Sequence, residues 1–300
     1  MKRITREHVV AGADRLVPRQ AALTVELGEV FCMETETCGQ PVIYTPDDCL
    51  LDRFVERRET GPVYINGVKA GDAVRLDILN IEVTGHASGA RRDGYMDFYE
   101  IKGSAAIGPG GLSVPVEPMI GVICFTPEKP EDVLHDLADV GGNLDYRDIC
   151  APNSICLTAR RDGGLLYAGD LHAHQGWGEW LGVGLECAGI VTLRAGIENT
   201  YISQRPVVIK KNAFSCIASR KTYGEAVLTA LGDAAAILQR MTGASYEESL
   251  TYCRLTGNGM NGQMWHIQYP RGLSGDKPET DMPYTVGIEI PTAKLCKLRT

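Results

Sequence analysis

The stretch that decides the fold is GPVYINGVKAGDAVRLDILNIEV, residues 61–83. Apolar and polar side chains alternate along both of its halves, which is typical of β-strands with one buried face. Gly71 and Asp72 lie between the halves and suit a tight turn. The stretch therefore predicts a β-hairpin whose second strand is the longer one.

A second stretch, LTVELGEVFCMETE at residues 23–36, has the same form, with Gly28 and Glu29 at its turn. The two stretches indicate either a weak internal repeat of one hairpin unit or two ordinary hairpins. RRDGGLL, residues 160–166, predicts a third hairpin turn, because Asp-Gly and Gly-Gly supply the positive φ that tight turns need. From about Ala21 to Ala195 the pattern is β throughout.

The pattern becomes helical after Thr222. YGEAVLTALGDAAAILQRMTGAS, residues 223–245, places apolar side chains at helical spacing, and Gly243 suits the end of that helix. In SYEESLTYCRLTG, residues 245–257, Ser245 and Glu248 form a capping box at the start of a second helix. YTVGIEIPTAKL, residues 284–295, predicts a closing strand.

These elements predict a mainly β (α+β) fold. We expect β-sandwich or barrel-like hairpin units, followed by a C-terminal αα-hairpin and the closing strand. Residues 1–210 form the β-rich region with the candidate site. Residues 211–300 hold the helical pair and closing strand, packed with the first region as one compact unit.

Composition excludes several classes of partner. The 300 residues are 44% hydrophobic and carry a net charge of −8, so we expect no broad basic face for nucleic acid or anionic lipid. No window approaches the ~18 apolar residues of a spanning helix, and the first residues do not resemble a signal peptide. We therefore expect a cytoplasmic protein that binds no membrane. Its ten cysteines are then reduced thiols, mostly buried.

Side chains that can bind a metal or carry a proton are concentrated in YAGDLHAHQGWGEWLGVGLECAG, residues 167–189. Asp170, His172 and His174 alternate, so on a strand they would point to one side. A carboxylate and two imidazoles are ligands that a divalent metal such as zinc takes. Glu179 follows two turn-forming glycines and can carry a proton beside the metal. The alternative is a solvated strand end, in which His172 binds Asp170 for structure alone.

A second polar cluster lies upstream, in ADVGGNLDYRDI at residues 138–149. Asn143 and Asp145 stand two residues apart, after Gly141 and Gly142. By itself this pattern is typical of a turn. Its polar side chains nevertheless make it a candidate to join the first cluster in one site.

Taken together, these segments resemble the acetamidase/formamidase family. GDLHAHQGWGE, residues 169–179, is similar to the family's Gly-Asp-x-His-x-x-Gln-Gly-x-Gly-Glu run. GGNLDYRD at 141–148, GLECAGIVTLR at 184–194 and the hairpin at 60–83 resemble further family segments, and NGQMWHIQYP at 261–270, with Gln263, fits the family's C-terminal part. The resemblance covers most of the chain from about Ala21, and three separate motifs occur in family order.

The resemblance implies hydrolysis of short linear amides to a carboxylate and ammonia, with a divalent metal that we expect to be zinc. It also implies a homo-oligomer, a dimer or tetramer. The matching positions, with His174 and Trp177 added from the local residue pattern, give three sets of site residues. The catalytic residues are Asp145, Glu179 and His172; the metal ligands are Asp170, His172, His174 and Glu186; the substrate-binding residues are Asn143, Gln175 and Trp177.

The sequence departs from the family pattern at His174, at Trp177 and in the N-terminal segment HVVAGADRLVPRQ. Trp177 and Trp180 make the entrance more aromatic, which favours a bulkier amide. Two other functions stay open at this point: a non-catalytic β-rich module that binds a metal and a small ligand, and an amidase whose nucleophile is Cys150 or Cys156. A thiolate needs an activating base or a positive field, and neither cysteine has a local partner in sequence.

Overall fold

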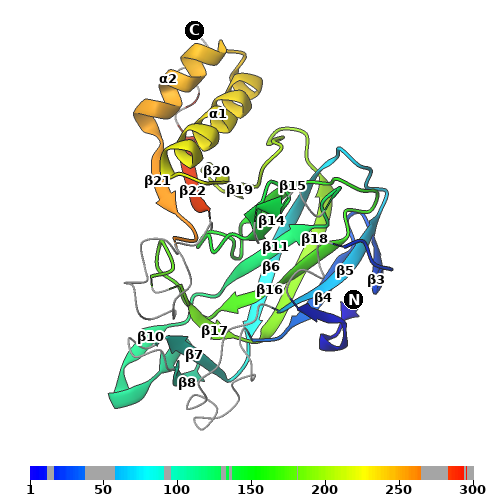
Figure 1. The fold of residues 1–300 in the computed structure, drawn as a ribbon, viewed down its shortest axis with the longest axis vertical. Helices are drawn as coiled ribbons and strands as arrows, with labels where there is room; N and C mark the ends of the chain where they lie inside the picture. Colours follow the sequence, from blue (N-terminus) through cyan, green and yellow to red (C-terminus); the bar gives the residue numbers. More distant parts are fainter. Residues whose placement is uncertain are drawn as a thin grey trace.

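The computed structural model describes residues 1–11, 17–37, 58–90, 96–129, 133–134, 137–180, 182–264, 283–293 and 295. These residues form two β-sheets and a helical pair at one end of the molecule (Figure 1). The predicted mainly β fold with a C-terminal αα-hairpin and closing strand is confirmed.

The first sheet has nine strands. Their order is β1 (Lys2–Ile4), β4 (Val30–Thr35), β18 (Gly189–Ile197), β6 (Ala73–Val83), β15 (Ser154–Thr158), β19 (Val207–Lys210), β20 (Ala213–Arg220), β22 (Tyr284–Pro291) and β21 (Asn258–Asn261). All neighbours pair antiparallel except β1 and β4. The pairing of β19 with β20 carries this sheet across residue 210, where the sequence suggests a boundary between two regions.

The second sheet contains the candidate site. Its main path is β10 (Ser113–Pro115), β9 (Ala105–Ile107), β8 (Met96–Lys102), β7 (His86–Ala90), β17 (Leu185–Cys187), β16 (Leu166–His172), β11 (Met119–Phe125), β14 (Gly141–Asn143), β13 (Leu137–Ala138) and β12 (Val133–Leu134). Off this path, β5 (Arg58–Asn66) pairs with β16, β2 (Val9–Ala11) and β3 (Leu23–Glu26). The described residues also include the 3₁₀ turns Arg6–His8 and Pro109–Gly111.

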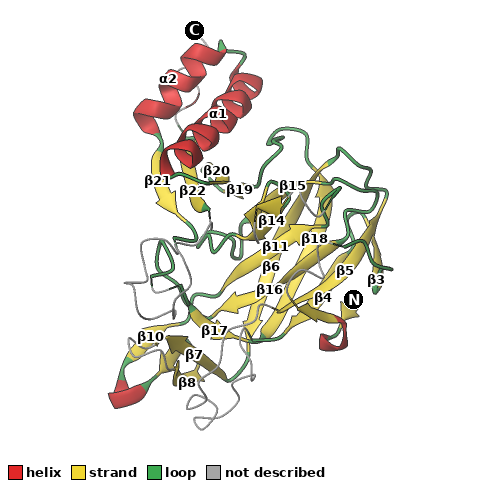
Figure 2. Ribbon diagram, viewed as in Figure 1, coloured by secondary structure: helices red, strands yellow, loops and turns green. Residues whose placement is uncertain are grey.

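The sheets pack face to face, and Figure 2 shows their strands in layers. Buried apolar side chains from both sheets form one hydrophobic cluster, to which β5 contributes Ile65 and β6 contributes Leu76. Every residue of β11 and of β16 is buried. Site residues on these strands are therefore held by the core itself.

The three predicted hairpins are wrong in one respect. β3 and β4, β5 and β6, and β15 and β16 are consecutive strands, but each pair is divided between the two sheets. The connections are arches across the core. Alternation identifies strands with one buried face, and two such strands bury that face equally well by pairing in one sheet or by facing each other across a sandwich.

Backbone hydrogen bonds join two of these arches at one end of the sandwich. The Ile65 amide donates to the Gly163 carbonyl at 3.0 Å, and the Gly71 amide donates to the Ala159 carbonyl at 2.8 Å. Gly163 and Gly164 have φ of 74° and 68°, so the predicted positive φ is present although the hairpin is not.

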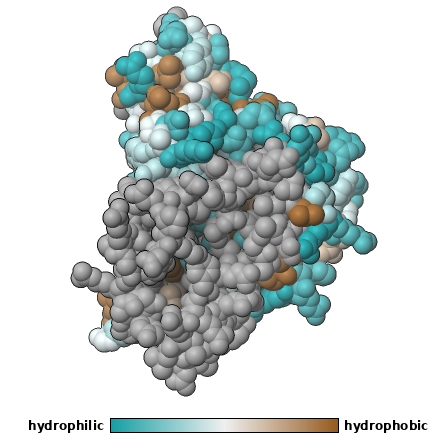
Figure 3. Space-filling model, in the orientation of Figure 1, coloured by the Kyte–Doolittle hydropathy of each residue, from teal (hydrophilic) through white to brown (hydrophobic). Residues whose placement is uncertain are grey.

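The C-terminal helices match the sequence closely. α1 (Tyr223–Thr242) ends at Gly243 with φ 76°, and α2 (Tyr246–Thr256) starts with the predicted Ser245–Glu248 capping box. A second hydrophobic cluster lies where α1 packs on β20 and β22. The described surface seen in Figure 3 is mainly hydrophilic, with apolar atoms showing on the helical pair.

Two further predictions concern the whole chain. No helix in the described part of the chain has the length and apolar character needed to cross a lipid bilayer. Seven of the ten cysteines are described, as reduced thiols; six are buried and Cys150 is partly buried. Cys38, Cys49 and Cys296 lie outside the described residues.

Candidate functional site

Five buried ionisable side chains meet at the end of β16. We call them the acidic cluster: Asp145, Asp170, His172, Glu179 and Glu186, each at most 4% exposed. Asp170 and His172 lie on β16, Glu186 on the neighbouring β17, and Asp145 follows β14. Strand pairing brings them together, because β17 and β11 flank β16, and β11 in turn pairs with β14.

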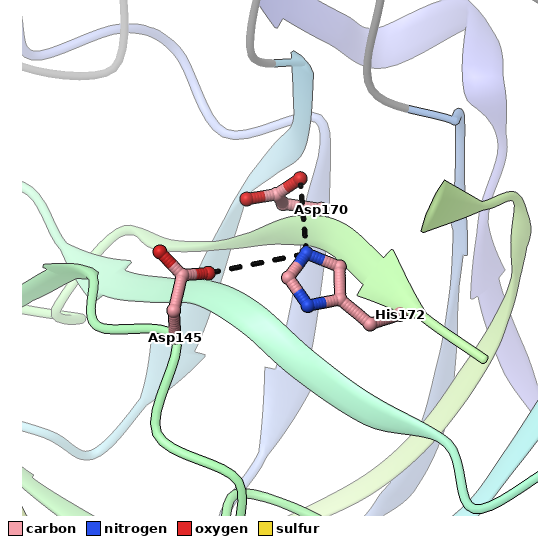
Figure 4. Close-up of side chains that lie close together, drawn as sticks. All are labelled: Asp145, Asp170 and His172. Carbon is pink, nitrogen blue, oxygen red and sulfur yellow. Dashed lines mark ion pairs between the residues drawn. The ribbon is translucent and has the colours of Figure 1, made fainter. Parts of the chain in front are cut away.

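Nε2 of His172 is the centre of this cluster. It lies 3.2 Å from Glu186 Oε1, 3.7 Å from Asp170 Oδ1 and 3.9 Å from Asp145 Oδ1. Figure 4 shows the Asp145 and Asp170 carboxylates approaching the same ring nitrogen from two different segments. Two sequence motifs about 25 residues apart therefore form one site.

Gln175 determines which ring nitrogen of His172 carries a proton. Its Nε2 donates to the Asp145 carbonyl oxygen at 2.6 Å, which leaves its Oε1 facing Nδ1 of His172. A carbonyl oxygen accepts, so Nδ1 carries the hydrogen in the neutral ring and Nε2 has a lone pair. That lone pair points at carboxylates, an arrangement that requires either a proton or a cation between them.

Metal-capable atoms gather in two groups. Asp145, Asp170 and His172 form one, and His172, Glu179 and Glu186 form the other; in each group the candidate ligand atoms lie within 4.8 Å of one another. Both groups use His172, which has only Nε2 to offer. A single ion at this nitrogen is therefore the simplest occupant.

The donor set fits a divalent metal. One imidazole with carboxylates is chemistry that zinc and its neighbours accept. In the described part of the chain, four atoms are buried without a hydrogen-bond partner: Nε2 of His172, Oδ1 of Asp145 and one oxygen each of Glu179 and Glu186. Buried charges this close are very costly unless they are paired or bind a metal.

The pKa values of the cluster residues are shifted because these ionisable groups are buried close together. Burial and the neighbouring Glu179 raise the pKa of Asp145 well above its ordinary value, and burial raises that of Glu186 likewise. Burial raises the pKa of Glu179 to about 8, against the favourable charge of His172. Burial by itself would lower the pKa of His172, but Glu186 and Asp170 raise it well above its usual range. Without a metal the cluster retains protons.

The backbone of the acidic cluster is unusual. Among the described residues, four that are not glycine have positive φ, and three of these are Asp145 (44°), Asp170 (53°) and Glu179 (43°). Such conformations are costly for residues with a Cβ and concentrate at functional sites. The fold therefore holds three carboxylates in strained positions that their burial alone does not require.

Two glycines that the sequence analysis did not single out make room for the cluster. A Cβ on Gly121, in β11, would lie 2.6 Å from Asp145 Oδ1 and 3.0 Å from Asp170 Oδ2. A Cβ on Gly184 would lie 2.4 Å from Nδ1 of His172. The Gly184 amide also donates to Glu186 Oε1 at 2.9 Å. Both positions look like ordinary turn or strand glycines in the sequence, which gives no signal of their role.

The remaining predicted residues lie around this cluster. Asn143 is buried and donates from Nδ2 to Asp145 Oδ2 at 2.8 Å. The Trp177 ring makes an edge contact with Tyr146, with 5.1 Å between centroids, and packs against the main core. Trp180 is 58% exposed.

His174 does not point toward Asp170 and His172, contrary to the sequence expectation. It lies two residues beyond the end of β16 and belongs to neither metal-capable group. Its Nδ1 is 3.6 Å from Glu117, which also binds Arg147 at 2.7 Å. The strand ends at His172, so the alternation that would align the three side chains stops before His174.

The cysteine alternative has little support in this geometry. Burial raises the pKa of Cys150 to about 11, assisted by Asp148, and burial raises that of Cys156 to about 12. Thiols with such values are poor nucleophiles at neutral pH.

Comparisons with known proteins agree with the sequence motifs. The model of the acetamidase/formamidase family matches residues 137–250. A search of curated proteins finds no match. Three solved structures share the fold over nearly the whole chain.

The first is described as a predicted acetamidase/formamidase from the thermophile Thermoanaerobacter tengcongensis, with 27% identity, TM-score 0.82 and coverage of 99% of this chain and 97% of that one. The second is an acetamidase from Bacillus halodurans, with 26% identity, TM-score 0.82 and coverage of 99% and 100%. The third, an acetamidase from Yersinia enterocolitica, is 21% identical with TM-score 0.81 and coverage of 98% and 92%, and supports the fold alone. The predicted resemblance to the acetamidase/formamidase family is thereby confirmed, on a matched segment that contains the whole acidic cluster.

Proposed function

We propose that this chain is an amide hydrolase that converts short linear amides and water into a carboxylate and ammonia with the help of a divalent metal, zinc in the first instance. The observation that carries the proposal is the single lone pair of His172, fixed by Gln175 and surrounded by buried carboxylates. The family match over residues 137–250 and the acetamidase structures supply the class of substrate.

Asp145, Asp170 and His172 would hold the metal, with Glu186 as a fourth donor, since its Oε1 also lies near Nε2 of His172. This gives Asp145 the role of a metal ligand, whereas the resemblance implied a catalytic residue. A bound divalent ion polarises a carbonyl oxygen and lowers the pKa of a bound water to ~7.

Glu179 would move the proton. Its pKa of about 8 in the metal-free fold is far above that of an exposed carboxyl. A carboxyl of this kind can accept a proton from water and return it to the departing nitrogen, so that ammonia leaves as a neutral molecule. Gln175 would keep the His172 ring oriented, because its two hydrogen bonds join the ring to the Asp145 backbone.

Ammonia release from formamide, acetamide, propionamide and butyramide tests the proposal, with Glu179→Gln as the matched variant. We expect activity on at least one amide and a loss of about 10²–10⁴-fold in kcat in the variant. Metal binding without ammonia release from any amide would instead favour the non-catalytic binding module.

Zinc as the metal, a cytoplasmic location and a homo-oligomer of two or four chains remain predictions. Leu228 on α1 is 71% exposed and Leu255 on α2 is 78% exposed. Light scattering on the purified protein measures the number of subunits directly.

A further inference from the structure

Gln263 is the one residue of the C-terminal part that the sequence motifs single out and the proposed mechanism does not use. It follows β21 and is fully buried. Among the described residues, neither its Oε1 nor its Nε2 has a hydrogen-bond partner. A buried carboxamide with both ends unpaired costs about 1–3 kcal/mol for each group, so its retention needs an explanation.

Two backbone hydrogen bonds hold Gln263 next to the segment that carries Asn143 and Asp145. Its amide donates to the Leu144 carbonyl at 3.0 Å, and its own carbonyl accepts from the Thr285 amide at 3.2 Å. Leu144 lies between Asn143 and Asp145, so the C-terminal segment touches the chain at the point where the cluster begins.

The preceding residue, Gly262, allows the two segments to approach this closely. A Cβ on Gly262 would lie 2.4 Å from the Leu144 carbonyl oxygen and 2.8 Å from Thr285 Cγ2. The close approach of the two segments is thus built into the sequence. Gln263 cannot move away from Leu144 to find another partner without breaking these contacts.

Asn143, which precedes Leu144 in the chain, carries another unpaired amide atom. Its Nδ2 donates to Asp145, but its Oδ1 is buried and has no hydrogen-bond partner among the residues that the structure describes. The Gln263 backbone binds Leu144, between Asn143 and Asp145, so the carboxamides of Gln263 and Asn143 would together offer two acceptors and the donors of Gln263 Nε2 to a ligand at the acidic cluster. An amide substrate presents the complementary set: N–H donors and a carbonyl acceptor.

We infer that the carboxamide of Gln263 binds the polar end of the amide substrate, with the free oxygen of Asn143 as a second acceptor, and so selects primary amides. This inference rests on the proposed function. The substrate class is a small primary carboxamide, whose –NH₂ can donate to both oxygens. An N,N-dimethyl amide has no donor to offer and would be rejected.

Gln263→Met tests the role, because methionine has nearly the same shape without polar atoms. Acetamide is titrated calorimetrically into the metal-loaded Glu179→Gln protein, with and without Gln263→Met. We expect about tenfold weaker binding with Gln263→Met, and in the otherwise wild-type background a similar rise in KM with a smaller change in kcat. The thermal midpoint should not fall, since two unpaired buried groups are removed.

Ser249→Ala is the matched control. Its Oγ on α2 is also buried without a partner in the described residues, but it lies on the helical pair and not beside the cluster. Like Gln263→Met, this variant should not lower the thermal midpoint. Unlike Gln263→Met, it should leave acetamide binding and KM unaltered.

Equal acetamide affinity with and without Gln263→Met, in a wild-type background that hydrolyses amides, would overturn the inference and leave the proposed function standing. So would equal rates on acetamide and N,N-dimethylacetamide in the wild type. A wild-type protein that neither binds nor hydrolyses any amide would contradict the proposed function, and this inference with it.

Discussion

Gln175 holds the imidazole of His172 in one tautomer, because its side-chain amide is anchored at 2.6 Å to the backbone carbonyl of Asp145 while its oxygen faces Nδ1. His172 ends β16 and Gln175 lies in the loop that follows, yet the anchor lies on a different segment. The orientation of the proposed metal ligand therefore depends on the contact between two sequence motifs.

Removing this contact should weaken the metal site without removing a ligand. We expect Gln175→Leu to lower metal affinity about 10–100-fold, as observed when a group that orients a ligand is lost. Competition with a chromogenic chelator measures the affinity, and nitrogen NMR of the His172 ring reports the tautomer. Unchanged affinity together with an unchanged tautomer would show that Gln175 does not position the ring.

His172 itself should be indispensable for metal binding. Elemental analysis of His172→Ala should find most of the metal lost. His174→Ala is the control: its Nδ1 faces Glu117 instead of the cluster, so it should retain the metal. The opposite result, with metal lost only from His174→Ala, would refute the site as described.

A methyl group at position 184 should be enough to disturb the cluster. The Cβ in Gly184→Ala would lie 2.4 Å from the His172 ring, so the ring must move and metal affinity should fall. Gly176→Ala is the matched control in the same stretch, because a Cβ there meets nothing within 4 Å and its φ is not positive. If both variants bind metal like the wild type, the packing of His172 against Gly184 is not required.

The metal-free protein should lose stability as pH rises. The pKa of Glu179 is about 8 in the fold against 4.5 ordinarily, so the folded state keeps a proton that the unfolded chain releases between these values. The stability linked to this proton is complete below about 4.5 and is lost as pH rises through about 8. The raised pKa values of Asp145, Glu186 and His172 act in the same direction.

Thermal unfolding at about pH 6 and about pH 9 checks this. The midpoint of the metal-free protein should be lower at the higher pH. Metal should reduce the difference, because it replaces the protons as counter-charge, and Glu179→Gln should reduce it because one titrating group is gone. A metal-free midpoint that increases with pH would contradict the assignment.

Trp177 should influence the choice of substrate. Its edge contact with Tyr146, the residue after Asp145, places it beside the cluster and not on an open surface. Trp177→Gly should change the ranking of amides of different chain length while the metal content stays the same. An unchanged ranking with weaker subunit association would make Trp177 an oligomer contact instead.

Local signals predicted the elements of this fold well. The Ser245–Glu248 capping box and Gly243 mark the helix ends because they act within one turn. The assignment of strands to sheets was not readable, since alternation is the same for a hairpin and for an arch across a sandwich.

The candidate site, too, could be predicted from the sequence only in part. The carboxylates and His172 were predicted from their motifs, but the closeness of Gly121 and Gly184 depends on segments that meet only in the fold. The positive φ of Asp145, Asp170 and Glu179 has no sequence signal, because these residue types adopt it only when the surrounding structure imposes it. His174 was misplaced because the end of β16 decides where alternation stops.

The central claim is that amide hydrolysis depends on one divalent ion bound at His172. The most direct test strips the protein with a chelator, restores zinc in steps, and measures bound metal and ammonia release from the preferred amide on the same samples. The account predicts that the rate rises in proportion to bound metal and levels off at about one ion per chain. The His172→Ala variant should neither bind the metal nor release ammonia. Full activity in the metal-stripped protein would contradict it.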